Sequence, residues 1–367
     1  MKLAHFALLS VIFTGSVVAQ DIKIVGTITQ PVKIPPSSEK HIAPRGAADT
    51  TGKITLLKVE LSDKAKNAFA TRAKNALAHT KQFATNASHS AYPGKVELGM
   101  GDVPVLNQGM HGTCVTFAVT AAIDAVLNKG DYVSQLCSLQ LGNYLEKNAY
   151  LPSGWAGSWG RFVLSQLDTY GIVNKEHQQT EGCGGLTAYP VNDMVGIDGL
   201  VNIEDYHQMS ENIGEKVLWS PILDVYQAIL DRADTNKTVD QVKAALNAGD
   251  RVTFGVLLLD FDLGFAGAVG KNKVEGDTWV LTPEIARDAY LKQEFGGHEM
   301  VITGYDDNAV AIDDQGQEHR GLFTLRNSWG KKVGDHGDFY MSYDYFKLLV
   351  IEAARLRNIS EPDSAAG

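Results

Sequence analysis

The sequence predicts a protein of the α+β class, in which helices and strands occupy separate stretches of the chain. An alternating apolar pattern covers residues 21–34 and 53–61, and a helical pattern follows over residues 62–84. A second helix is predicted over residues 115–128, and an apolar strand begins at His298. With 367 residues, of which 44% are hydrophobic, the chain is long enough for one or two domains with an ample core.

The composition excludes several classes of protein. The 36 glycines, 11 prolines and 3 cysteines are ordinary numbers for this length, which excludes collagen-like, low-complexity and disulfide-scaffold proteins. The formal net charge of −10 argues against electrostatic capture of nucleic acid or of an anionic membrane. The sequence has no CxxC, HExxH, P-loop or GxGxxG motif, so neither a metal nor a cofactor is expected.

Residues 1–19 have the features of a secretory signal. Lys2 precedes a mainly apolar run, and the small residues Val17 and Ala19 predict cleavage after Ala19. The alternative is a membrane anchor, but the apolar run is shorter than the roughly 20 residues of a spanning helix. We therefore expect export without membrane insertion, to a periplasmic or extracellular compartment in which disulfides persist.

The next segment, residues 20–95, is predicted to form a hairpin followed by one helix, with Ser62 as the N-cap of that helix. Residues 21–95 contain 12 Lys and Arg against 5 Asp and Glu, a balance of +7. The remaining residues 96–367 contain 20 against 38, a balance of −18. Either the two surfaces are unrelated, or a basic segment is held against an acidic body.

A cysteine with unusual surroundings begins the helix over residues 115–128. The preceding stretch, QGMHGTC, contains Gly109 and Gly112, which allow a tight turn and expose the sulfur of Cys114. The first turn of a helix stabilises a thiolate, because its backbone N–H groups are unpaired. An isolated cysteine is more often a buried apolar residue, but the combination of glycine turn, helix start and Gln108 points to a nucleophile.

Two later segments supply the groups that a thiol nucleophile needs. His298 heads an apolar strand, and Asn327 ends another, two residues before Trp329. A thiolate can attack an acyl group, an imidazolium can protonate the leaving amine, and an amide can orient the imidazole ring. Cysteine, histidine and asparagine therefore indicate acyl-transfer chemistry when they occur together.

The blocks QGMHGTCVTFAV, GGHEMVITGY and LRNSWG resemble the three signature blocks of the papain family of cysteine peptidases, family C1. The similarity extends over about residues 102–345. It implies a two-lobed papain-like fold within residues 96–360, followed by a flexible tail at 361–367. A helical left lobe would carry Cys114, and an antiparallel β-barrel-like right lobe would carry His298 and Asn327.

The resemblance also implies a role for each matching residue. Cys114 would be the nucleophile, His298 its partner and Asn327 the residue that holds the imidazole. Gln108 would donate its side-chain amide to the oxyanion hole, together with the backbone N–H of Cys114. Trp329 would shield the bond between His298 and Asn327 from water.

Further residues follow from the same resemblance. Gly157, Ser158 and Gly297 would bind substrate, with Ser158 in place of a glycine. Cys137 and Cys183 lie close to segments that the family joins by a disulfide, and the alternative is two buried thiols.

The chain departs from the family pattern at residues close to the expected catalytic groups and in the spacing between Cys114 and His298. Val115 and Val333 stand where aromatic residues are usual, and Glu299 stands where a small residue is common. We expect Glu299 either to raise the pKa of His298 or to be an ordinary surface residue. The interval from Cys114 to His298 is 298 − 114 = 184 residues, longer than the roughly 130–150 of compact members.

The extra length predicts insertions at residues 189–237 and 264–295. They would be either loops that set specificity at the edge of the cleft or ordinary surface elaborations.

The sequence thus predicts a secreted, monomeric cysteine endopeptidase that hydrolyses protein or peptide substrates through a thioester acyl-enzyme. Because a free nucleophile would be hazardous, residues 20–95 are expected to be a propeptide that covers the cleft as an intramolecular inhibitor. Two alternatives remain: a non-proteolytic acyltransferase or amidase on the same site, and an inactive papain-fold binding protein.

Overall fold

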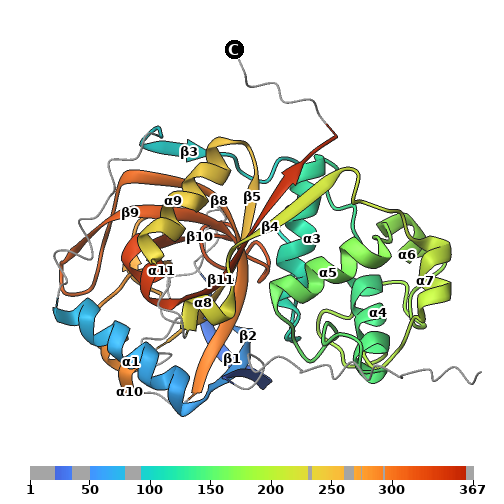
Figure 1. The fold of residues 1–367 in the computed structure, drawn as a ribbon, viewed down its shortest axis with the longest axis horizontal. Coiled ribbons are helices and arrows are strands. Elements are labelled where there is room, and N and C mark those ends of the chain that lie inside the picture. Colours follow the sequence, from blue (N-terminus) through green and yellow to red (C-terminus); the bar gives the residue numbers. More distant parts are fainter. Residues whose placement is uncertain are drawn as a thin grey trace, which may run out of the picture.

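The computed structural model describes residues 21–34, 50–78, 92–229, 234–259, 268–273, 275–291 and 294–360. The predicted signal at residues 1–19 and the tail at 361–367 lie outside the described residues. Two lobes, one helical and one rich in strands, lie side by side (Figure 1). Within the described ranges, no helix has both the length and the apolar character needed to cross a membrane.

The helical lobe follows a short strand, β3 (Lys95–Glu97), and a loop. It contains five helices: α3 (Cys114–Leu127), α4 (Gln135–Lys147), α5 (Gly160–Tyr170), α6 (Lys175–Thr180) and α7 (Ile203–Met209).

The strand-rich lobe contains most of the remaining chain. Its strands are β4 (Val217–Leu223), β5 (Arg251–Leu258), β6 (Ala268–Lys271), β7 (Glu275–Trp279), β8 (Glu294–Ile312), β9 (Glu318–Arg326), β10 (Asp338–Ser342) and β11 (Val350–Asn358). Its helices are α8 (Val225–Ile229), α9 (Thr235–Asn247), α10 (Pro283–Leu291) and α11 (Tyr343–Leu349).

The strands pair in the order β4-β11-β5-β8-β6-β7-β10-β9, and β8 also pairs with β9. Five strands, β8, β6, β7, β10 and β9, therefore form a ring of pairings, which accounts for the barrel-like character of the lobe, while β4 lies at an open edge. Strands β10 and β7 run parallel, so the sheet is mixed and the expectation of a wholly antiparallel lobe is corrected. The α+β fold class itself is confirmed.

The predicted N-terminal hairpin and helix are both present. Strands β1 (Ile22–Ile34) and β2 (Thr50–Leu61) pair antiparallel, and α1 (Asp63–Ala78) follows. The Ser62 hydroxyl accepts a hydrogen bond from the backbone N–H of Ala65, which is the geometry of an N-cap. Residues 79–84 of the predicted helix lie outside the described residues.

Helix α3 connects the lobes, because it packs against α4 and α5 on one side and against β5 and β8 on the other. Its sequence, CVTFAVTAAIDAVL, is apolar around nearly the whole circumference, as a fully enclosed helix requires. It ends at Asn128, whose backbone has the left-handed conformation of a C-cap. The first residue of α3, Cys114, is therefore fixed where the two lobes meet.

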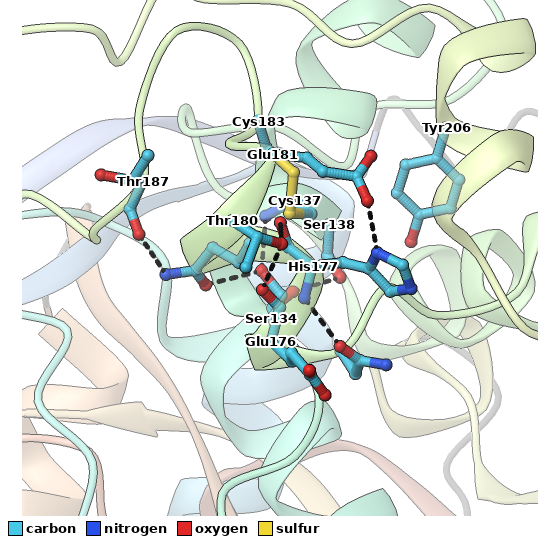
Figure 2. The surroundings of a disulfide bond; sticks show 12 residues. Ser134, Cys137, Ser138, Glu176, His177, Thr180, Glu181, Cys183, Thr187 and Tyr206 are labelled. Carbon is cyan, nitrogen blue, oxygen red and sulfur yellow. Dashed lines mark hydrogen bonds and ion pairs between the residues drawn. A yellow bond between two sulfur atoms is a disulfide. The ribbon is translucent and has the colours of Figure 1, made fainter.

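Cys137 and Cys183 form a disulfide with a Cα–Cα distance of 5.1 Å, as the resemblance implied. Figure 2 shows that it ties α4 to the loop after α6, beside Ser134. The hydroxyl of Ser134 caps α4 and donates to Gln178, whose amide donates in turn to the backbone oxygen of Thr187. The bridge and this hydrogen-bonded chain together stabilise the helical lobe.

Replacing both cysteines by alanine, C137A/C183A, should lower the free energy of unfolding by about 4 kcal/mol. The bridge closes a sequence separation of 46 residues, and loop closure of that length restricts the unfolded chain by about this amount. Urea unfolding of the two proteins measures the difference. Reductant should destabilise the parent and leave the variant unchanged, and equal unfolding free energies would contradict the prediction.

Candidate active site

Cys114 lies at the N-terminus of α3 and is completely buried, with an exposed fraction of 0%. Burial raises the pKa of its thiol to about 12, although a hydrogen bond from the backbone N–H of Glu299 acts in the opposite direction. The carboxyl group of Glu299 adds to the increase. The sulfur is therefore a neutral thiol in this structure.

His298 and Asn327 come from adjacent strands, β8 and the end of β9. The imidazole Nε2 of His298 lies 2.8 Å from the amide oxygen of Asn327, so Nε2 is the protonated nitrogen in the neutral ring. The other nitrogen, Nδ1, is buried and has no hydrogen-bond partner among the described residues. Burial lowers the pKa of His298 to about 4, against the opposite effect of the Asn327 bond.

Trp329 stacks on the imidazole of His298, with ring centroids 4.4 Å apart and planes inclined by 22°. Its exposed fraction is 7%, and it also contacts Trp279 and Phe339 edge to face. The indole thus covers the imidazole that is bonded to Asn327 and limits the access of water to it.

Gln108 is held on both sides of its amide. Its oxygen accepts a hydrogen bond of 2.8 Å from the hydroxyl of Ser328, and its Nε2 donates to the backbone oxygen of His111 at 2.9 Å. The same Nε2 donates to the backbone oxygen of Thr55 at 3.2 Å. Thr55 belongs to β2, so the N-terminal hairpin reaches the group that was predicted to bind the oxyanion.

Strand β2 lies across the site and pairs antiparallel with the first residues of β8, Leu57 opposite Gly297. The side chain of Leu57 lies against Gly112 and Gly157, where an added Cβ would stand 3.1 and 2.6 Å from its Cδ2. At Gly297 an added Cβ would stand 2.7 Å from Val59. The absence of side chains at these three glycines leaves room for the hairpin to lie against the site.

Ser158 is the third residue that was expected to bind substrate. It is buried, and its hydroxyl donates to the backbone oxygen of Pro152 at 2.8 Å. Its side chain thus supports the local loop.

Glu299 corrects a prediction. Its exposed fraction is 2%, so it is no surface residue, and the pKa of the neighbouring His298 is lowered and not raised. Its carboxyl group faces that of Glu352, and burial and this neighbour raise the pKa of Glu299 well above its usual range. Glu352 in turn accepts a hydrogen bond from the backbone N–H of Gly160 at 2.8 Å.

Three residues that contact the site were not predicted. Ser328 donates a hydrogen bond to the Gln108 amide, Leu57 packs against Gly112 and Gly157, and Tyr189 donates to the backbone oxygen of Gln108. Ser328 directly follows Asn327 in the block LRNSWG, so the sequence could have indicated that it lies at the site. Among the residues that the structure describes, no group of three or more His, Cys, Asp or Glu side chains could hold a metal ion.

Comparisons with known proteins agree with this geometry. The model of the Peptidase C1-like family matches residues 284–359, which include His298 and Asn327. Zingipain-2 of Zingiber officinale is 23% identical over 269 residues, which cover 72% of this chain and 87% of the relative.

Two solved bacterial structures are also similar. Xylellain, a cysteine protease from Xylella fastidiosa, is 20% identical with a TM-score of 0.45, and the match covers 73% of this chain and 87% of that chain. The cysteine protease and lectin-like domains of Cwp84 from Clostridium difficile are 17% identical with a TM-score of 0.46, with coverage of 75% and 53%.

The predicted resemblance to papain-like cysteine peptidases is confirmed by the family model and the curated relative. The matched family is one of peptidases, which are hydrolases.

The burial of Cys114 predicts a strong pH dependence of its alkylation. Of the three cysteines Cys114 is the free one, so iodoacetamide reports on it alone. In the full-length protein, a pKa of about 12 leaves almost no thiolate at pH 8, and alkylation should be at least about a hundredfold slower than that of a free cysteine.

After proteolytic removal of residues up to about 95, water reaches the sulfur. The inflection of the alkylation rate should then move down by several pH units, because the desolvation that raises the pKa is relieved. Superimposable pH profiles before and after removal would contradict this assignment.

Proposed function

We propose that the chain is a secreted, monomeric cysteine endopeptidase made as a zymogen, in which residues 20–95 cover the site until they are removed. The observation that carries the proposal is the pair of buried groups beneath β2. His298 is bonded through Nε2 to Asn327, and its buried Nδ1 has no hydrogen-bond partner among the described residues. The protein would act on protein or peptide substrates in a periplasmic or extracellular compartment.

The chemistry follows from what happens when β2 leaves. Water reaches Cys114 and His298, and both pKa values move back toward their ordinary ranges. The proton of the thiol can then pass to Nδ1 of His298, while the first turn of α3 stabilises the thiolate. Asn327 keeps the imidazolium in the orientation that it has in the covered site.

Hydrolysis then takes two steps. The thiolate adds to the scissile carbonyl carbon, and the oxyanion accepts hydrogen bonds from Nε2 of Gln108 and the backbone N–H of Cys114. The carbon–nitrogen bond breaks as His298 gives its proton to the leaving amine, which leaves a thioester on Cys114. Water, deprotonated by the neutral imidazole, hydrolyses the thioester and restores the thiol.

The covered state is incompatible with this reaction for two reasons. The Thr55 carbonyl accepts a hydrogen bond from Gln108 Nε2, the atom that would otherwise hold the oxyanion. Leu57 lies against Gly157 and opposite Gly297, two residues that the resemblance assigns to substrate. Both contacts come from the hairpin, and this supports its role as an intramolecular inhibitor.

Turnover of a peptide library before and after limited proteolysis tests the function. The processed protein should cut peptides within the chain, and the variant C114A should cut none while its melting temperature stays within a few degrees of the parent. C114A removes a small buried group, so its cost in stability is modest compared with the loss of the nucleophile.

Other results would lead to other assignments. Hydrolysis of simple amides without peptide cleavage would favour the amidase alternative. Peptide cleavage by C114A at the parental rate would refute the Cys114 mechanism.

The contact of Leu57 with Gly112 and Gly157 predicts the strength of inhibition. L57A in the full-length protein should weaken the docking of the hairpin by about 2–3 kcal/mol, because Leu57 is 3% exposed and its removal leaves a cavity. Alkylation of Cys114 before any cleavage should therefore accelerate by about 30-fold or more.

Val25 is a matched control in the same hairpin, because 43% of its surface is exposed and V25A removes little buried area. V25A should leave the alkylation rate near that of the parent. If L57A and V25A behave alike, Leu57 does not lock the site.

A further inference from the structure

The turn from Gln108 to Thr113 carries the proposed oxyanion donor and leads directly to the proposed nucleophile, Cys114. Gln108 begins the turn with the oxyanion donor, and Thr113 ends it directly before the nucleophile. The turn lies outside the helices and strands, and Gly109 within it has a φ of +61°. Bonds between Gln108 and His111 close the turn, and further contacts from elsewhere in the chain fix its shape.

A hydroxyl group bridges the two ends of this turn. The hydroxyl of Tyr189 donates to the backbone oxygen of Gln108 at 2.8 Å. It also lies 2.8 Å from the hydroxyl of Thr113, which must donate because the Tyr189 hydrogen is already used. The chain of bonds runs from Thr113 through Tyr189 to Gln108.

The ring of Tyr189 is fixed by three neighbours. It stacks on Trp155 with centroids 5.4 Å apart and planes inclined by 13°, and it contacts Phe117 and His111 edge to face. Phe117 lies on α3, one turn after Cys114, so the ring touches the helix that carries the nucleophile. Burial raises the pKa of Tyr189, so the hydroxyl keeps its proton at any working pH.

The two residues after Tyr189 hold the middle of the turn. The backbone oxygen of Pro190 accepts from the ring Nε2 of His111 at 2.6 Å, and that of Val191 accepts from the backbone N–H of Met110 at 3.0 Å. A Cβ at Gly109 would stand 1.7 Å from the Val191 oxygen, so only glycine fits there. Residues 189–191 are therefore joined to the turn by four hydrogen bonds.

We propose that Tyr189 is a positioning residue for the oxyanion hole, which aligns Gln108 with Cys114 by bridging the two ends of the turn that joins them. This inference rests on the proposed function, because it concerns the same site. It also gives a role to the start of the inserted residues 189–237, for which specificity and surface elaboration were the two expectations. Their first three residues support the oxyanion turn.

The test compares Y189F, Q108A and the double variant with the parent, all after removal of the N-terminal segment. Y189F should lower kcat for peptide hydrolysis about tenfold or more and leave KM nearly unchanged, since an oxyanion donor acts mainly in the transition state. If Tyr189 acts through Gln108, Y189F should cause no further loss in the Q108A background.

Two probes of Cys114 separate positioning from general damage. A peptide aldehyde forms a carbon–sulfur bond with the thiol, and its oxygen then occupies the oxyanion hole. Its affinity for Y189F should fall by the same factor as kcat. Iodoacetamide forms no oxyanion, because it displaces iodide at a saturated carbon, so its rate should stay within about twofold.

Tyr206 supplies the matched control. It is fully buried in the helical lobe, and its hydroxyl donates to the backbone oxygen of Gly171 at 3.1 Å. Y206F loses a comparable buried hydrogen bond and should leave kcat and aldehyde affinity unchanged. If Y189F does not fold, T113V, which removes the hydroxyl that donates to Tyr189, should shift both quantities in the same direction.

Three results would overturn the inference: an unchanged kcat in Y189F, an equal loss in the parent and Q108A backgrounds, or an equal loss in Y206F. Failure of the proposed function is a separate result. A parent that cleaves no peptide refutes the peptidase assignment, whereas aldehyde binding by the parent and its loss in Y189F still decide the positioning role.

Discussion

The pairing of β2 with the first residues of β8 is the constraint on which the rest of the site depends. Because Leu57 lies opposite Gly297 and against Gly112, the hairpin passes next to residues that are close in sequence to His298 and Cys114. The glycines at 112 and 157 make this approach possible, since a side chain would collide with Thr27 at position 112 and with Leu57 at position 157. Gly157, which the resemblance assigns to substrate, thus also accommodates the hairpin.

Burial beneath this strand controls the chemistry as well as the access. A thiolate and an imidazolium stabilise each other, but each is costly to form in a site without water. Burial therefore moves the two pKa values in opposite directions, upward for Cys114 and downward for His298. Both groups become neutral, so the proposed nucleophile is inactive while the bond between His298 and Asn327 is already in place.

The local parts of the site were predictable from the sequence, because local patterns encode them. The glycine turn before Cys114, the strand that His298 heads and the cap at Ser62 all depend on residues that are neighbours in the chain. The β2–β8 pairing was not predictable, because an alternating strand pattern contains no information about which distant strand it joins. Tyr189 was missed for a similar reason: its partner Gln108 is 81 positions away.

Glu299 illustrates a different limit. A charged residue next to a histidine is usually solvent-exposed, and nothing nearby in the sequence indicated Glu352, with which it is buried. The parallel pair β10 and β7 is likewise a property of the tertiary fold, since each strand taken alone would suit an antiparallel neighbour.

Charge and apolar burial have different roles in the association of residues 21–95 with residues 96–367. Charge acts at a distance, whereas apolar contacts act once the two parts touch. If the basic and acidic surfaces face each other, the balance of +7 against −18 would attract the segment over a distance that salt limits to about 8–10 Å. Once docked, Leu57, Val59 and Phe69 are at most 3% exposed and belong to the same core cluster as α3 and the central sheet. Removing this segment would therefore expose a part of the hydrophobic core, so we infer that its release requires cleavage of the chain and does not follow from a change of ionic strength alone.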